Sequence, residues 1–125
     1  MFIAHDLSVV RQVSTRTAVM YLGSIVELAP TDALYVAPAH PYSRALIAAV
    51  PLPRVPVGAR NASAVLGGEP QKMLIGGEPP SALNPPSGCR FNPRCPLATD
   101  RCRTERPALR EIGGGRSVAC HTPLV

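Results

Sequence analysis

Four cysteines in the last third of the chain are the residues whose type and spacing point most clearly to chemistry. They follow the pattern C-x5-C-x6-C-x17-C, and the first 88 residues contain none. Four thiolates suit tetrahedral zinc or an iron–sulfur cluster. The spacing is wider than the tight pairs usual in zinc sites, which favours a cluster because its thiolates stand further apart. The candidate ligands are Cys89, Cys95, Cys102 and Cys120.

Two other arrangements of these cysteines remain open. They could form two disulfides, with three possible connectivities, or they could be four unrelated thiols. Disulfides require an oxidising compartment. We expect no secretory signal, because the residues after Met1 are not a basic region followed by a long apolar core. Spacing alone therefore ranks a metal or cluster first without excluding the alternatives.

The composition indicates two partial units rather than one ordinary domain. Glycine and proline make up 25 of 125 residues, mostly after Val50, and there are five aromatic residues and no tryptophan. A large aromatic core is therefore not available, and something other than hydrophobic burial must hold the Pro-rich half, such as a metal-centred staple. No apolar run reaches the roughly 18 residues that a membrane span needs, so we expect a soluble or peripheral protein.

The charge is basic and concentrated near the cysteines. The net charge is +5, and between Cys89 and His121 seven arginines face three acidic residues, a balance of +4. A basic surface of this kind is typical of proteins that bind nucleic acid, anionic lipid or an acidic partner. It could equally offset the negative charge of a thiolate-bound cluster.

The first fifty residues predict short strands and helices around His5. This histidine follows an apolar run, and in α/β sheets ligands bind at the carboxyl ends of strands. Hydrophobic spacing and turn residues predict a strand at 2–4, a helix at 7–13 capped by Asp6, a hairpin of 17–22 and 25–28, and helices at 32–36, capped by Thr31, and at 42–50.

The remainder of the chain predicts little regular structure. Residues 51–87 are a Pro/Gly-rich linker, residues 88–121 form the four-cysteine module, and Gly113–Gly115 form a flexible tip. The expected fold class is therefore an α/β fragment followed by a Pro/Gly-rich, largely irregular four-cysteine module.

The motifs together resemble a known family. FIAHDLSVVR followed by VMYLGSIVE resembles the end of an ABC-transporter nucleotide-binding domain. AHPYSRALIAAVP, PSALNPPSGCRFNPRCP and VACH resemble the cysteine-bearing C-terminal extension of oligopeptide and dipeptide importer ATPases. The resemblance covers almost the whole chain. It implies a remnant of the nucleotide-binding domain at 1–37 and the extension at 38–125.

The resemblance also implies roles for single residues. His5 would contact the γ-phosphate of ATP and help position the hydrolytic water. His40, Pro41 and Tyr42 would dock the extension onto the nucleotide-binding domain. His121 adjoins the candidate ligand Cys120, so it would support that ligand or substitute for one in a metal site. A 4Fe–4S cluster, with zinc as the alternative, would be bound by Cys89, Cys95, Cys102 and Cys120.

The chain lacks most of an ATP site. Its only lysine, Lys72, lies in EPQKMLI, so there is no glycine-rich loop ending in Lys-Ser or Lys-Thr to cradle phosphates. The catalytic carboxylate and the LSGGQ-like signature are missing too. We therefore interpret the chain as a C-terminal fragment or truncated product, which binds ATP and magnesium only within the full-length subunit and does not hydrolyse ATP unaided.

Two functions follow as hypotheses. In the first, the chain contributes the switch histidine and a structural or regulatory iron–sulfur domain to ATP-driven peptide uptake. Its partners would be membrane permease subunits and a second nucleotide-binding subunit, at the cytoplasmic face of the membrane. The alternative is a stand-alone four-cysteine zinc module that binds nucleic acid through its arginines. Only Phe91 could stack on bases in that module, so we expect no nucleic-acid partner.

Overall fold

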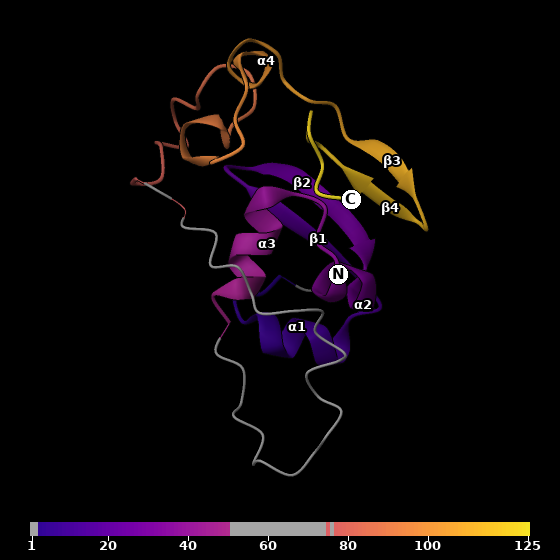
Figure 1. Ribbon diagram of the computed structural model, residues 1–125. Helices are drawn as coiled ribbons and strands as arrows, with labels where there is room; N and C mark the ends of the chain where they lie inside the picture. Colours follow the sequence, from indigo (N-terminus) through magenta and orange to yellow (C-terminus); the bar gives the residue numbers. More distant parts are fainter. Residues whose placement is uncertain (1–2, 51–74, 76) are drawn as a thin grey trace, which may run out of the picture.

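The computed structural model describes residues 3–50, 75 and 77–125, which form short helices and one four-stranded sheet (Figure 1). In chain order the elements are α1 (Leu7–Val13), β1 (Arg16–Tyr21), β2 (Ser24–Pro30), α2 (Thr31–Val36), α3 (Pro41–Ala48), the 3-10 turn η1 (Asn92–Arg94), α4 (Asp100–Thr104), β3 (Arg110–Gly113) and β4 (Arg116–Val118).

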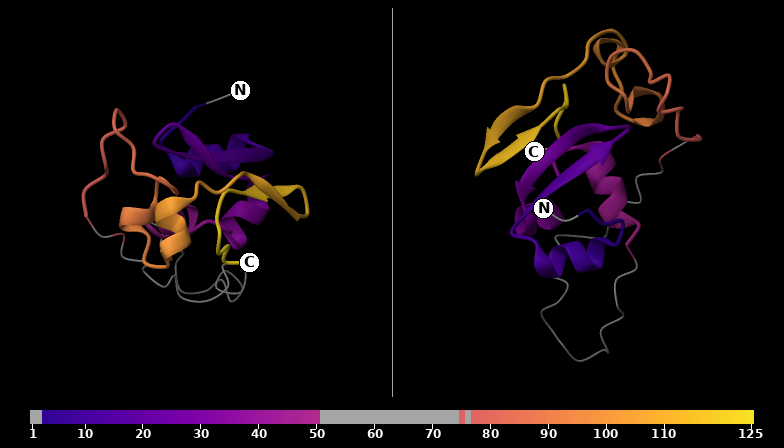
Figure 2. Two further views of the ribbon diagram at one scale, coloured as in Figure 1. Left: turned by 90° about the horizontal axis from the view of Figure 1, so that it is seen from above. Right: turned by 180° about the vertical axis from the view of Figure 1, so that it is seen from behind.

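The sheet has the order β1-β2-β4-β3, with antiparallel pairing throughout. β1 and β2 are joined through Leu22 and Gly23, which both have positive φ angles, of 45° and 73°. That is the backbone of a two-residue type I′ turn, whose twist matches that of the strands it connects. β4 pairs with β2 through Glu27 and Val118, so segments 91 residues apart lie side by side (Figure 2).

Side-chain caps fix where two helices begin. The Asp6 carboxylate accepts hydrogen bonds from the amides of Ser8 and Val9 at 2.9 and 3.3 Å, so it satisfies donors that the first turn of α1 leaves open. At the start of α3, the His40 ring Nδ1 accepts from the Tyr42 amide at 3.0 Å. Pro41 occupies the first helical position, where its missing N–H costs nothing.

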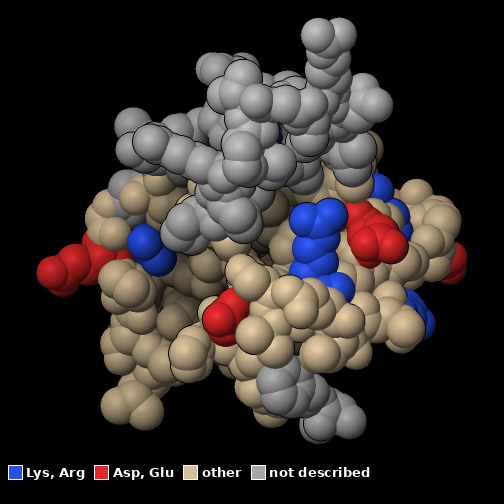
Figure 3. Space-filling view, turned by 90° about the horizontal axis from the view of Figure 1, so that it is seen from below, with Lys and Arg blue, Asp and Glu red and all other residues tan. Residues whose placement is uncertain are grey.

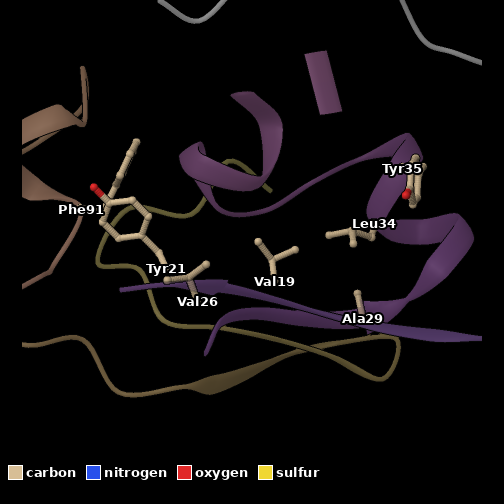
Figure 4. Packing of buried hydrophobic residues seen from close by; sticks show 7 residues of the cluster. All are labelled: Val19, Tyr21, Val26, Ala29, Leu34, Tyr35 and Phe91. Carbon is tan, nitrogen blue, oxygen red and sulfur yellow. The ribbon is translucent and has the colours of Figure 1, made fainter. Parts of the chain in front are cut away.

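The main core lies between the β1–β2 hairpin and the helices. Figure 4 shows Val19, Val26 and Ala29 pointing from the strands toward the side of the sheet that α2 covers. Phe91, from the cysteine-rich segment, joins this cluster and is only 1% exposed. Its ring meets that of Tyr21 edge-on at 5.2 Å between centroids. The cysteine-rich segment is therefore packed onto the hairpin rather than tethered beside it.

Several predictions for the first fifty residues are confirmed. The hairpin, the helix capped by Asp6 and the helix after His40 are present, although α3 ends at Ala48 rather than at Val50. The cap assigned to Thr31 is wrong: Pro30 precedes α2 without a side-chain bond, and the Thr31 hydroxyl pairs instead with that of Thr17 at 2.9 Å.

The predicted strand at 2–4 is wrong for its described part. Ile3 and Ala4 are not in a strand, and Ile3 is 86% exposed, while Phe2 lies outside the described residues. An apolar run becomes a strand only when another strand satisfies its backbone, and no described strand lies beside this one.

The last third of the chain is more ordered than predicted. The segment predicted as a flexible glycine tip comprises Gly113, the last residue of β3, and the two glycines of the β3–β4 turn. This hairpin completes the sheet. Residues 77–87 contain no helix or strand, as expected for the linker, but 51–74 and 76 lie outside the described residues. The division at residue 37 stays a prediction.

Candidate functional site: the cysteine group and the His5 hollow

The four cysteines are held by short, tightly connected segments. Cys89 precedes η1, Cys95 ends it, Cys102 lies in α4 and Cys120 follows β4. The Cys89 amide donates to the Cys102 carbonyl at 2.8 Å, which ties the first segment to α4. Gly88 permits this approach: its φ is +68°, and a Cβ there would lie 2.4 Å from the same carbonyl oxygen.

Polar side chains brace the loop that carries these cysteines. The Asn92 amide group donates to the carbonyls of Ser87 and Cys89, at 2.8 Å each. The Ser87 hydroxyl donates to the Arg103 carbonyl at 3.0 Å, and the Thr99 hydroxyl lies 3.4 Å from the Cys102 sulfur. These bonds fix the path of the backbone on both sides of the thiols.

The thiols lie within electrostatic reach of one another. Burial raises the pKa of Cys89, Cys95 and Cys120, and neighbouring cysteines raise each of these pKa values further. The pKa of Cys95 rises to about 11, mainly by burial. These shifts favour the protonated form of Cys89, Cys95 and Cys120, and a bound cation would favour their thiolate forms.

The structure shows all four cysteines as free thiols. Within residues 3–50, 75 and 77–125, no three His, Cys, Asp or Glu side chains are arranged to hold a metal ion. The predicted metal site at Cys89, Cys95, Cys102 and Cys120 is thus not confirmed and stays a prediction. The donor chemistry nonetheless fits a thiolate-bound centre, because four unbridged thiols influence one another in one module.

His5 is exposed and lines a hollow of about 560 Å³. Asp6 and the start of α1 form one side of this hollow, and Leu46, Ala49 and Val50 form the other. The predicted contact of His5 with a γ-phosphate stays a prediction, because the position of His5 in this hollow does not test it. These features show that the imidazole is accessible and that α3 and the residues after it stand across from it.

A buried glutamate, which the sequence did not single out, holds the segment before α3. Glu27 is fully buried, and its carboxylate accepts hydrogen bonds from the backbone amides of Ala39 and His40 at 2.8 Å each. The Arg116 guanidinium lies 3.6 Å from the same carboxylate and also donates to the Ala37 carbonyl. β2, β4 and the segment leading into α3 therefore meet at one charged group.

His40, Pro41 and Tyr42 pack between the Glu27 carboxylate and the cysteine module. His40 is 1% exposed, and burial lowers its pKa to about 4, so the imidazole is neutral. The Tyr42 ring lies 4.7 Å from that of Tyr21 and 5.4 Å from that of Phe91. His121, the other histidine near the cysteines, places its Nε2 2.9 Å from the Glu105 carbonyl.

The basic charge does not gather into a nucleic-acid surface on the face shown in Figure 3. There, Lys and Arg groups are interspersed with Asp and Glu groups on a mostly uncharged surface. Two arginines proposed for nucleic acid are paired: Arg101 with Glu105 at 2.8 Å and Arg103 with Asp100 at 3.1 Å. None of these features supports the nucleic-acid alternative. Among the described residues, no helix is both long and apolar enough to cross a membrane.

Comparison with known proteins identifies the family. Residues 26–102 match the family described as the C-terminal region of oligopeptide/dipeptide transporters. The chain is 55% identical over 120 residues to a probable peptide ABC transporter ATP-binding protein of Sinorhizobium fredii, covering 96% of this chain and 31% of that protein.

Two further relatives agree. A putative oligopeptide transport ATP-binding protein of Bacillus subtilis is 46% identical over 121 residues, which are 97% of this chain and 34% of the relative. A putative peptide import ATP-binding protein of Brucella abortus is 54% identical over 97% of this chain and 32% of its own length. The chain spans about a third of the curated relatives it matches. It belongs to the family of oligopeptide/dipeptide transporter C-terminal regions.

Proposed function

We propose that this chain serves as part of the ATP-binding subunit of a peptide importer. The observation that carries the proposal is the match of nearly the whole chain to relatives named as peptide-transport ATP-binding proteins. In that setting its partners are membrane permease subunits and a second nucleotide-binding subunit, and it lies at the cytoplasmic face of the membrane as a peripheral component.

His5 has the catalytic role in this proposal. Its exposed imidazole, in a hollow opposite the end of α3, stabilises negative charge on the γ-phosphate of ATP and orients the attacking water. ATP and magnesium bind through parts of the intact subunit that this sequence does not contain. The contribution of the chain to hydrolysis is therefore one positioned side chain, not a complete active site.

The four cysteines hold a 4Fe–4S cluster in the same proposal, with zinc as the alternative. Support comes from four unbridged thiols that influence one another within one braced module. Such a centre supplies cross-links that a Pro/Gly-rich segment with little core needs, and it can respond to oxidation. The residues that would hold it are Cys89, Cys95, Cys102 and Cys120.

A chimera tests the role of His5. The corresponding third of the Sinorhizobium fredii relative is replaced by this chain, and magnesium-dependent ATP hydrolysis is measured with the relative's permease subunits. We expect hydrolysis in the chimera, and a fall in kcat of about 100-fold in its His5→Ala variant with nucleotide affinity nearly unchanged. Gln12→Ala, at an exposed position on α1 outside the hollow, serves as the matched control. Equal rates in the His5→Ala variant and the parent chimera would refute the role.

A further inference from the structure

A second hollow lies where the cysteine module meets the β1–β2 turn. Its volume is about 550 Å³, which is within the range of small-molecule sites. Three segments line it: the turn with the start of β2, residues 106–109, and Cys89–Phe91. Figures 1 and 2 show the module in orange beside this end of the hairpin. We call this hollow the module groove.

The surface of the module groove is largely apolar. Phe91, Val26 and Ala119 are buried side chains that line it. Ile25 and Leu109, which line it too, are 41% and 44% exposed. Large aliphatic side chains left open in a concave site gain free energy when an apolar ligand group covers them.

Two guanidinium groups give the module groove a positive charge. Arg90 is held by a hydrogen bond from its Nη1 to the Leu22 carbonyl, and Arg106 by one from its Nη2 to the Ser24 hydroxyl at 2.8 Å. Each thereby uses one of its donors and retains others. No Asp or Glu is among the described residues that line the groove. Such a site favours a ligand that combines a carboxylate with an aliphatic group.

We propose that the module groove binds a short peptide through its C-terminal carboxylate. Arg90 and Arg106 hold the carboxylate, and the last side chain of the peptide lies against Ile25 and Leu109. A volume of about 550 Å³ suits two residues better than a segment of a folded partner. This inference rests on the proposed function, because import delivers peptides to the compartment that contains this chain. The groove then acts as a sensor of imported peptide, next to Cys89.

Nuclear magnetic resonance of the full 15N-labelled chain tests the proposal. The probe is alanyl-leucine, and the matched control ligand is its C-terminal amide. We expect shifts concentrated at Ser24, Ile25 and Leu109, with a dissociation constant of about 1 mM or tighter. Amidation of the peptide or the substitution Arg106→Gln is expected to weaken binding at least about tenfold. Arg103→Gln, on α4 outside the groove, is expected to leave it unchanged.

Several results would overturn the proposal. These are no shifts up to about 20 mM peptide in a well-dispersed spectrum, equal shifts with the amide, or shifts centred away from the groove. Signal dispersion also shows whether the Arg106→Gln variant is folded. The experiment measures binding alone, so a negative result leaves the ATP-binding-subunit proposal standing. Failure of the chimera to hydrolyse ATP would in turn leave the binding result intact.

Discussion

Replacing Glu27 by glutamine should destabilise the fold far more than its conservative chemistry suggests. The carboxylate is fully buried and accepts two backbone amides at 2.8 Å. A glutamine has one acceptor oxygen, and its NH2 group would face the second amide. One buried donor is then unsatisfied, at a cost of about 1–3 kcal/mol. Loss of the negative charge opposite Arg116 adds roughly 1–2 kcal/mol.

The expected loss in the free energy of unfolding is therefore about 3 kcal/mol. Urea unfolding followed by circular dichroism measures it. With a denaturant slope of about 1–1.5 kcal/mol per molar, the midpoint should fall by about 2–3 M. Glu111→Gln, at an exposed position on β3, is the control and should shift the free energy by less than about 0.5 kcal/mol.

A double-mutant cycle separates the ion pair from the hydrogen bonds. Arg116→Met alone removes the charge partner and leaves both amide bonds to Glu27 intact. Combined with Glu27→Gln, it should show a coupling of about 1 kcal/mol. A free energy of unfolding of Glu27→Gln within about 1 kcal/mol of the parent chain would refute this account. Removing a buried acceptor of two amide hydrogen bonds should cost more than that.

Two further predictions concern backbone crowding and pH. Gly88→Ala should lower the free energy of unfolding by at least about 2 kcal/mol and speed thiol labelling at Cys89, because the new Cβ displaces the Cys102 carbonyl. Gly113→Ala is the control, since Gly113 also has a positive φ but has open space around it, and it should lower the free energy by only about 1 kcal/mol. If both variants unfold at the same urea concentration, the close contact at Gly88 is not what matters. The folded pKa of His40 is lowered from its ordinary 6.5 to about 4, so stability is full above 6.5 and falls toward pH 4, by up to about 3 kcal/mol. His40→Asn, which keeps a capping oxygen but does not titrate, should flatten this dependence in urea midpoints measured between pH 4 and 7.5; an unchanged pH profile would contradict it.

Local features of the fold could be predicted from the sequence, and contacts between distant segments could not. Asp6 as a helix cap and a hairpin turn containing Gly23 depend on neighbouring residues alone. Pattern reasoning found both, although the turn lies one residue earlier than predicted. The pairing of β4 with β2 depends on segments 91 residues apart, and no local pattern encodes it. The strand predicted at 2–4 failed for the converse reason, since its apolar run has no described neighbour to pair with.

The site shows the same division. The cysteines and His5 were singled out from residue type and motif, and their roles stay predictions, whereas Glu27 and Arg116 were missed. A single charged residue within the apolar run SIVELAP was the available signal for Glu27, because a carboxylate inside a strand that is otherwise buried requires donors around it. Its donors come from the segment before α3 and from β4, which only the folded structure brings together.

A metal analysis of the full chain, purified without oxygen, shows whether the four cysteines share one metal centre. Absorption, iron, sulfide and zinc are measured on one sample, with Cys95→Ser and Cys102→Ser as variants. We predict a broad band near ~400 nm with iron and sulfide, lost in both variants. Stoichiometric zinc in a colourless chain would keep the shared thiolate site but replace the cluster. A colourless chain without metal would show that the four cysteines do not form a shared metal site.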